Sequence, residues 1–202
     1  PDLIFLNAAA LEEETYAAVS QIAPVVVTKG TGVNWKVDFL LIGHALGKAE
    51  EAQRLLDQYH ADAEAYAARW SDDAPSVSFV HSNGTRTRVM GISSFAGSIA
   101  EDLGLDRPES QQIYATSEDI SPELLDLADG DWIFYSGQGD GVALIENAAL
   151  WPTLEGVAAG HAVFVEYEPF YFNAGPSAAR IVLDTIAETL DRLNQERQAM
   201  EL

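Results

Sequence analysis

The hydrophobic positions of the chain are spaced for a mixture of short buried strands and amphipathic helices. The longest helical pattern covers residues 48–70, where glycine and proline are absent and strong helix formers predominate. Its apolar residues recur every three or four positions and predict one buried stripe, made of Ala52, Leu55, Leu56, Tyr59, Ala63, Tyr66 and Trp70. Such a helix spans roughly 34 Å. It is long enough to join two α/β units as a stiff strut, and an ordinary surface helix of one domain is the alternative.

The residues before this helix read as a strand, a helix and a second strand. Residues 3–7 and 24–27 are short, continuous apolar runs, which are typical of buried strands. Residues 12–22 begin with glutamates, which suit the positive end of a helix dipole, and continue with an apolar face. This order predicts a parallel βαβ unit. Because so apolar a first strand should have neighbours on both sides, we expect the upstream part of the unit to be missing from the chain.

A short glycine loop separates this unit from the next helix. Residues 30–32 read Gly-Thr-Gly, without the third glycine, the lysine and the Ser/Thr of known phosphate loops. The loop is therefore a weak candidate for binding a nucleotide. Asn34 is expected to cap a helix over residues 35–46, and Gly47 is expected to end it.

A linker over residues 71–75 leads into a second α/β segment. Short apolar runs predict strands over residues 77–81, 87–91, 132–135 and 162–165. Helical patterns predict helices over residues 94–103, from Ser121 onward, over residues 142–150 and over residues 176–198. The whole chain is therefore expected to be an α/β protein.

Composition and charge narrow the functional classes. The chain has 202 residues, of which 48% are apolar, so it can build a real core in one or two domains. Its formal net charge of -21 repels nucleic acid and anionic membranes. The sequence contains no cysteine, which excludes disulfides and thiolate metal sites in this stretch. No apolar run in it reaches the length of a transmembrane helix.

No pattern in the chain predicts catalysis. The histidines, His44, His60, His81 and His161, lie on separate predicted elements without the spacing of a zinc site. The G-x-S-x-G nucleophile motif is absent, and no cysteine is present to act as a nucleophile. We therefore expect a protein without catalytic residues, without protein metal ligands and without a cofactor.

Aromatic residues gather in loops at the edges of the predicted sheets. They are Trp35, Phe95, Tyr167, Phe170, Tyr171 and Phe172, and Asn173 follows the last of them. Ligands of open α/β sheets bind outside the carboxyl ends of the strands, and residues 170–173 directly follow the last predicted strand. An aromatic wall with a few polar groups predicts a site for a mid-sized organic ligand. About half of these rings are expected to be core packing.

A series of short motifs resembles one family. The motifs are PDLI at residues 1–4, IAPVV at 22–26, WKVDFLLIGHALGK at 35–48, SFAGS at 94–98, SPELL at 121–125, WPTL at 151–154 and GPSAA at 175–179. In this order they resemble the substrate-binding proteins of bacterial ABC importers for iron-siderophores, a group that also contains cobalamin binders. The resemblance covers nearly the whole chain.

The resemblance implies a class III periplasmic-binding-protein fold, with two Rossmann-like α/β lobes joined by a single long helix. Residues 1–47 would be the remainder of an incomplete N-terminal lobe, residues 48–70 the interlobe helix and residues 75–202 the C-terminal lobe. It also implies export, either to the periplasm or to a lipid anchor at the outer face of the cytoplasmic membrane.

The resemblance also implies two kinds of site. Each lobe of such a protein presents a surface carboxylate to the permease, and Glu123 matches the position in the C-terminal lobe; its alternative role is to stabilise the helix dipole. Family members that hold trianionic catecholates often place arginine in the loops that carry Phe95, Tyr171 and Phe172 here. This chain has aromatic residues there instead, and Arg86 and Arg88 remain as basic candidates. A trianion that enters so acidic a protein would need local cations, so a neutral or cationic ligand, such as a ferric hydroxamate, is favoured.

The leading interpretation is capture of a ferric siderophore and its delivery to a membrane permease, by a monomer that binds no nucleic acid. Iron would enter only inside its siderophore. A cobalamin or haem binder of the same fold is one alternative. An α/β enzyme that holds phosphate at residues 30–32 or 137–141 is another, and an adhesion or scaffold lobe without a ligand is the third.

Overall fold

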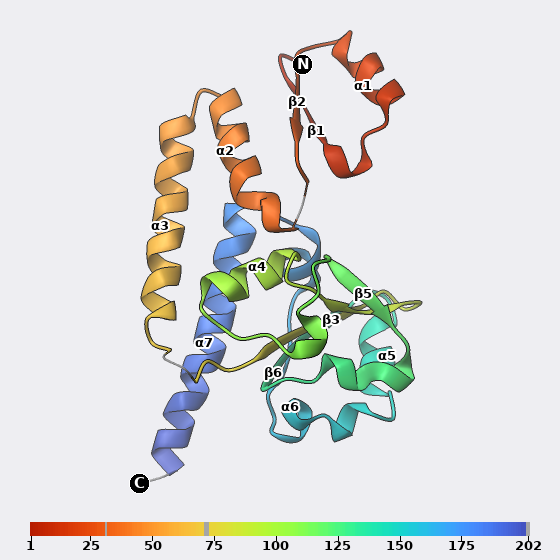
Figure 1. The fold of residues 1–202 in the computed structure, drawn as a ribbon, viewed down its shortest axis with the longest axis vertical. Helices are drawn as coiled ribbons and strands as arrows, with labels where there is room; N and C mark the ends of the chain where they lie inside the picture. Colours follow the sequence, from red (N-terminus) through yellow and green to blue (C-terminus); the bar gives the residue numbers. More distant parts are fainter. Residues whose placement is uncertain (31, 71–72, 201–202) are drawn as a thin grey trace.

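The computed structural model describes residues 1–30, 32–70 and 73–200, with the backbone alone for Ala10 and residues 193–200. Thr31 of the glycine loop, Ser71 and Asp72 of the linker and the last two residues lie outside these ranges. The described elements form two separate sheets, with a helical layer beside them (Figure 1).

The first sheet is small and parallel. It pairs β1 (Ile4–Asn7) with β2 (Val25–Thr28), in a register that places Ile4 opposite Val25. α1 (Glu13–Ser20) connects the two strands, after the short 3-10 helix η1 (Ala8–Ala10). The predicted βαβ unit is confirmed. It lies at the top of the view in Figure 1, apart from the larger sheet.

A helical hairpin follows this unit. The 3-10 helix η2 (Gly32–Asn34) runs directly into α2 (Trp35–Ala45), and α3 (Ala49–Ala67) packs antiparallel beside it. The prediction of Asn34 as a cap is wrong, because its backbone is already helical and its side chain makes no capping bond. Gly47, with φ 69°, does end α2. Its N–H donates to His44 O and that of Lys48 donates to Gly43 O, which is a Schellman motif.

The long helix α3 packs against α2, α4 and α7. Its buried residues are Ala52, Leu56, Tyr59, Ala63 and Tyr66. Leu55, predicted in the same stripe, is 40% exposed, because the buried steps run four, three, four, three from Ala52 and pass over it. Trp70 lies beyond the helical end and is partly buried against the core.

The second sheet has five strands in the order β5-β4-β3-β6-β7. They are β3 (Val77–Ser82), β4 (Thr87–Met90), β5 (Ser117–Ile120), β6 (Trp132–Gly137) and β7 (Ala162–Phe164). β3, β6 and β7 are parallel, while β4 runs antiparallel to β3 and to β5. The four predicted strands of this segment are present, and β5 was not predicted.

Helices cover both faces of the five-stranded sheet. On one face, α4 (Phe95–Asp102), α7 (Pro176–Met200) and the π-helical turn η6 (Glu168–Phe172) close a core around Phe79 and Phe134. On the other face, a second core contains Val80, Ile133 and Ile145. It is covered by α5 (Gly141–Glu146), α6 (Glu155–Ala158) and the 3-10 helices η4 (Pro122–Ala128) and η5 (Trp151–Thr153). A further 3-10 turn, η3 (Glu109–Gln111), lies before β5.

The short helix predicted to begin at Ser121 is present as the 3-10 helix η4, with Pro122 at its first position and without a capping bond from the Ser121 side chain. Within the described ranges, no helix has both the length and the apolar character needed to cross a bilayer.

Candidate ligand-binding site

One face of the five-stranded sheet changes from apolar to polar near the ends of β3 and β6. Phe79 and Phe134 are register partners in the core. Two positions further along the strands, four neighbouring strands contribute one cross-strand row: Ser136, His81, Arg88 and Asp119. Because side chains of a strand alternate between faces, this polar row lies on the same face as the phenylalanines. It therefore marks the carboxyl edge of the parallel strands, where α/β sheets bind their ligands.

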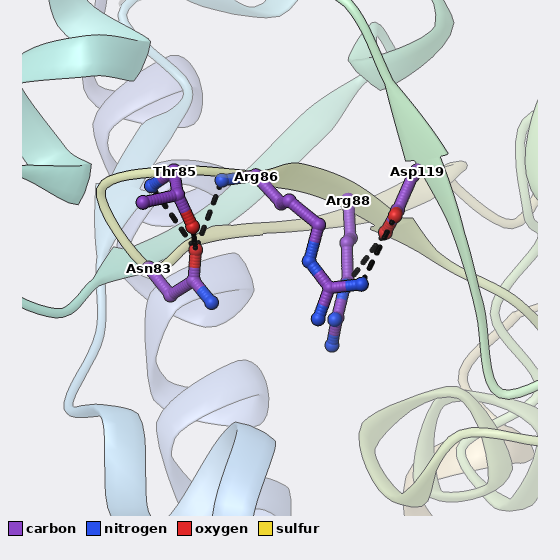
Figure 2. Close-up of polar contacts among 5 residues, drawn as sticks. All are labelled: Asn83, Thr85, Arg86, Arg88 and Asp119. Atoms are coloured by element: carbon purple, nitrogen blue, oxygen red, sulfur yellow. Dashed lines mark hydrogen bonds and ion pairs between the residues drawn. The ribbon is translucent and has the colours of Figure 1, made fainter.

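The two arginines predicted from the sequence meet at this row and share one carboxylate (Figure 2). Arg88 Nε donates to Asp119 Oδ1 at 2.8 Å, and Arg86 Nη1 donates to Asp119 Oδ2 at 3.3 Å. The side chain of Arg88 is 29% exposed and that of Arg86 is 55% exposed. Both guanidinium groups are thus fixed on the sheet and still reach solvent.

The β3–β4 turn places Arg86. Asn83 Oδ1 accepts hydrogen bonds from the backbone N–H of Thr85 and of Arg86, and from the Thr85 hydroxyl, as Figure 2 shows. Such an Asx turn is what an Asn-Gly pair between two strands favours. The Ser-Asn-Gly sequence, predicted to be a turn, therefore positions a candidate binding residue.

Aromatic rings of the segment after β7 pack on His81 in the polar row. The Tyr167 ring lies 4.8 Å from the His81 ring between centroids, and the Tyr171 ring lies 5.3 Å from it. The Tyr171 hydroxyl donates to Phe134 O at 2.7 Å, which attaches η6 to the middle of β6. Phe172 stacks on Tyr167 and is exposed, as is Asn173. Phe172 and Asn173 are therefore exposed on the segment whose Tyr167 packs on His81, the register partner of Arg88.

The other predicted aromatics lie in the core. Trp35, Phe95 and Phe170 are 2%, 6% and 2% exposed. Trp35 packs edge-on against Tyr59 and Phe95, and Phe170 packs on the Phe79 and Phe134 rings. Half of the six predicted rings are thus core residues.

His81 is a buried member of the row that the sequence did not single out. Burial, and secondarily the charge of Arg88, lowers the pKa of His81 to about 4, so the imidazole is neutral near pH 7. Its Nε2 and the Ser136 hydroxyl have no hydrogen-bond partner among the described side chains and backbone. The alternation of β3 carries the only sequence signal, since Val77, Phe79 and His81 share one face.

Arg107 supports the strands below the row and was also missed. It is buried, lies 4.7 Å over the Phe79 ring and donates to Met90 O and Gln111 Oε1. Burial lowers the pKa of Arg107 to about 10, which leaves it charged at neutral pH. Its role here is structural, because its contacts hold β4 and η3 against β3.

A cavity of about 220 Å³ lies between the small sheet and the start of α7. Asn7 and Thr28, at the ends of β1 and β2, line it together with Trp35, Asp38 and Gly175. The buried Asp38 accepts from the N–H groups of Lys29 and Gly30, and so shapes the loop after β2. Pockets for drug-sized ligands hold roughly 300–1,000 Å³. This cavity therefore has room for only part of a siderophore-sized molecule.

Glu123 lies in the first turn of η4, which covers the sheet face opposite to the one that carries the polar row. It is fully exposed, and its hydrogen bond with the Ser121 hydroxyl lowers the pKa of the Glu123 carboxyl. A hollow of about 430 Å³ lies beside this turn, and its walls include Ser121, Pro122, Arg86 and Asp119. Within the described residues, Glu123 has no ion-pair partner.

The described residues contain no group of three metal-ligating side chains placed to hold an ion. Their exposed cations and aromatic rings instead provide a surface for an organic anion or for a metal that is already chelated.

Comparison with known sequences gives a family and a relative. The profile of a family described as periplasmic binding protein matches residues 1–166. The probable siderophore-binding lipoprotein YfiY of Bacillus subtilis (strain 168) is 27% identical over 202 residues, which cover 92% of this chain and 62% of YfiY. The chain thus spans less than two thirds of the length of that relative.

Solved structures share the fold. Staphylococcus aureus SirA superimposes with a TM-score of 0.80 and 26% identity, over 95% of this chain and 76% of SirA. SirA in complex with staphyloferrin B gives a TM-score of 0.81 and 26% identity, over 95% of this chain and 72% of that chain. The iron-uptake system-binding protein FeuA of Bacillus subtilis has a TM-score of 0.79 at 20% identity, over 94% of this chain and 72% of FeuA, and is similar in fold alone.

Proposed function

Because the chain belongs to the periplasmic binding protein family, we propose that it captures a ferric siderophore and delivers it to the permease of an ABC importer. Its α/β fold is of the class III type, as in SirA. The similarity to YfiY and to SirA, which was solved with staphyloferrin B, supports the ligand class. The function is binding and transfer, without a catalytic step.

The two sheets support a two-lobe arrangement. We propose that residues 1–47 belong to one lobe, residues 48–70 form the interlobe helix and residues 75–202 form the second lobe. The separate β1–β2 and β3–β7 sheets agree with this division. The packing of α3 on α2, α4 and α7 makes the connection stiff, so we expect a small hinge motion on binding.

The observation that carries the proposal is the arginine pair beside an aromatic surface at the ends of β3 and β6. The predicted residues divide into two groups. Arg86, Arg88, Tyr167, Phe172 and Asn173 would contact the ligand. Trp35, Phe95, Phe170 and Tyr171 would hold this surface in place, and Trp35 would also face the part of the ligand that enters the cavity.

Tryptophan fluorescence tests the proposal on the full chain. Ferrioxamine B, ferrichrome, ferric enterobactin and cobalamin are titrated side by side, and saturable quenching by a ferric siderophore is expected. Arg88→Gln should weaken that binding about tenfold or more, because a charged hydrogen bond to the ligand is lost. Arg54→Gln, on the exposed side of α3, is the matched control and should leave the affinity unchanged.

The titration also separates the alternatives. Quenching by cobalamin alone would keep the fold and overturn the siderophore assignment. Absence of quenching by all four ligands would reject the binding function. A ferric hydroxamate is expected to bind best, because Asp119 offsets part of the positive charge of the two arginines that a trianionic catecholate would need.

We further propose that Glu123 docks on a basic pocket of the permease, outside the cytoplasmic membrane, while the protein remains a monomer. Its full exposure and the absence of a described ion-pair partner leave its charge available to a partner. Glu123→Gln should reduce siderophore uptake by cells severalfold and leave the ligand affinity unchanged. Glu64→Gln, an equal charge change on the exposed side of α3, should affect neither.

A further inference from the structure

Asp119 is a single carboxylate that serves two arginines. It accepts from Arg88 at 2.8 Å and from Arg86 at 3.3 Å, and among the described ion pairs neither arginine has another acidic partner. The three side chains together carry one net positive charge. An anion that approaches the arginines therefore meets a site whose attraction is already half neutralised.

The sheet prevents Asp119 from leaving this position. Arg88 and Asp119 are direct register partners on β4 and β5, where opposite Cβ atoms lie about 5 Å apart. Aspartate has a short side chain, so its carboxylate stays within a few ångströms of both guanidinium groups in any rotamer. Because it is also 52% exposed, the carboxylate faces the same solvent from which a ligand arrives.

A ligand anion bound to either arginine would lie within about 4–6 Å of Asp119, where like charges disfavour each other strongly. A neutral complex meets no such repulsion, and a cationic complex is attracted by Asp119, which offsets part of its repulsion by the arginines. The charge of the whole chain adds in the same sense, because its net charge is -21.

We propose that Asp119 is a charge filter, which lowers the affinity of the site for polyanionic ferric ligands relative to neutral or cationic ones. The inference rests on the proposed siderophore function and assigns it a specificity-determining residue. Asp119 acts through its own negative charge on the ligand, and the arginines supply hydrogen bonds to ligand oxygens.

The test compares Asp119→Asn with Glu118→Gln in the full chain. Asparagine keeps the size and the acceptor oxygen of aspartate and removes its charge. Glu118 is adjacent on β5 and exposed, but strand alternation directs it to the opposite face, so Glu118→Gln removes the same charge from nearly the same place. Cationic ferrioxamine B and trianionic ferric enterobactin are titrated at about 50 mM salt, where charges act over more than about 10 Å.

Asp119→Asn should tighten enterobactin binding about tenfold, which corresponds to about 1.4 kcal/mol, and should leave ferrioxamine B equal or slightly weaker. Raising the salt to about 1 M should remove most of the gain, because screening then acts within about 3 Å. Glu118→Gln should change the ratio of the two affinities less than threefold.

Three results would overturn the inference. Equal losses of affinity for both ligands in Asp119→Asn would make Asp119 a positioning residue for the arginines. Unchanged affinities for both ligands in Asp119→Asn, or the same change of the affinity ratio in Glu118→Gln, would mean that the charge of Asp119 does not select between ligands. Failure of the unsubstituted protein to bind either complex is a different result, because it rejects the siderophore function itself.

Discussion

The two sheets of this protein contain similar apolar strands but differ in how much of each strand is buried. β3 is buried at all six positions, while β2, with three consecutive valines, is only partly buried at each of its four. The helices differ in the same way: α4 buries six of its eight residues and α1 buries none. An apolar run thus sets the capacity for burial, and its neighbours decide whether that capacity is used.

The candidate site takes residues from the well-buried sheet and from the less buried one. The polar row is anchored on the well-buried sheet, where the strands and the aromatic segment hold each side chain. The cavity takes Asn7 and Thr28 from the ends of the less buried strands. We therefore expect the β3–β7 side to fix the geometry of binding, and the β1–β2 side to adjust to the ligand.

The largest effect should come from a core deletion in the five-stranded sheet. Phe79→Ala removes a side chain that is 0% exposed and packs on Phe134, Phe170 and Arg107. It should lower the free energy of unfolding by about 3–5 kcal/mol, through lost burial and a residual cavity. Phe5→Ala in β1, where the ring is 37% exposed, should cost about 1 kcal/mol or less. Urea denaturation followed by fluorescence measures both, and similar losses would show that the two sheets are equally supported.

The strands that could be predicted from the sequence are those that contain apolar residues in short runs, in either sheet. β3 and β6 combine such runs with nearly complete burial, whereas β4 and β7 were predicted although they are less buried. β5 was missed, because its sequence Ser-Glu-Asp-Ile is mostly polar and it is an edge strand with β4 as its neighbour. Arg86, Arg88 and the aromatic segment were identified as candidates, but their partners were not.

The polar row explains why the partners escaped prediction. His81 and Arg88 belong to one hairpin, but Asp119 and Ser136 lie far from them in sequence and join the row only through the register of four strands. Register depends on long-range pairing, which local periodicity does not encode. In addition, Asp119 is one of 32 acidic residues, so nothing in the composition distinguishes it.

A second prediction concerns the loss of folding stability in acid, which should come from His81 in the five-stranded sheet. The pKa of His81 is lowered to about 4 in the folded state, against about 6.5 in an unfolded chain. Between these values the unfolded state binds a proton that the folded state does not, so stability falls as the pH falls from about 6.5 to about 4. The contribution that is lost is up to about 3 kcal/mol.

His81→Gln should remove this part of the pH dependence. Denaturation midpoints at pH 7 and pH 4.5 are compared for His81→Gln and for His44→Gln, whose imidazole is exposed on α2. The His44 variant should keep the slope of the unsubstituted protein. An unchanged slope in the His81 variant would contradict the neutral, buried histidine, whichever effect the substitution has at pH 7.

A third prediction tests the contact between the helical hairpin and the five-stranded side. Asp102, at the end of α4, accepts hydrogen bonds from Lys36 of α2 and from the Tyr59 hydroxyl of α3. Burial, together with Asp102, raises the pKa of Tyr59, so this phenol remains a donor. Asp102→Ala leaves two partly buried donors without an acceptor and should cost about 1–3 kcal/mol. Urea denaturation measures this loss.

The control for Asp102 is the exposed pair of Lys48 and Glu51, whose charged atoms are 3.8 Å apart. Glu51→Ala should change the stability by about 0.5 kcal/mol or less, because exposed pairs contribute little. Equal effects of the two substitutions would mean that Asp102 does not join the helices to the sheet.

The smallest expected effect comes from making the same backbone change in the helical hairpin and in the five-stranded part of the molecule. Gly47, in the α2–α3 turn, and Gly139, after β6, have φ of 69° and 56°, and a Cβ at either position meets no atom within 4 Å. Gly47→Ala and Gly139→Ala therefore introduce the same left-handed strain, about 1–2 kcal/mol each, without steric clashes. If the molecule unfolds as one cooperative unit, both substitutions lower hydrogen-exchange protection equally in α3 and in β3. We expect local opening instead: Gly47→Ala should reduce protection mainly in α2 and α3, while Gly139→Ala should reduce it mainly in β3 and β6.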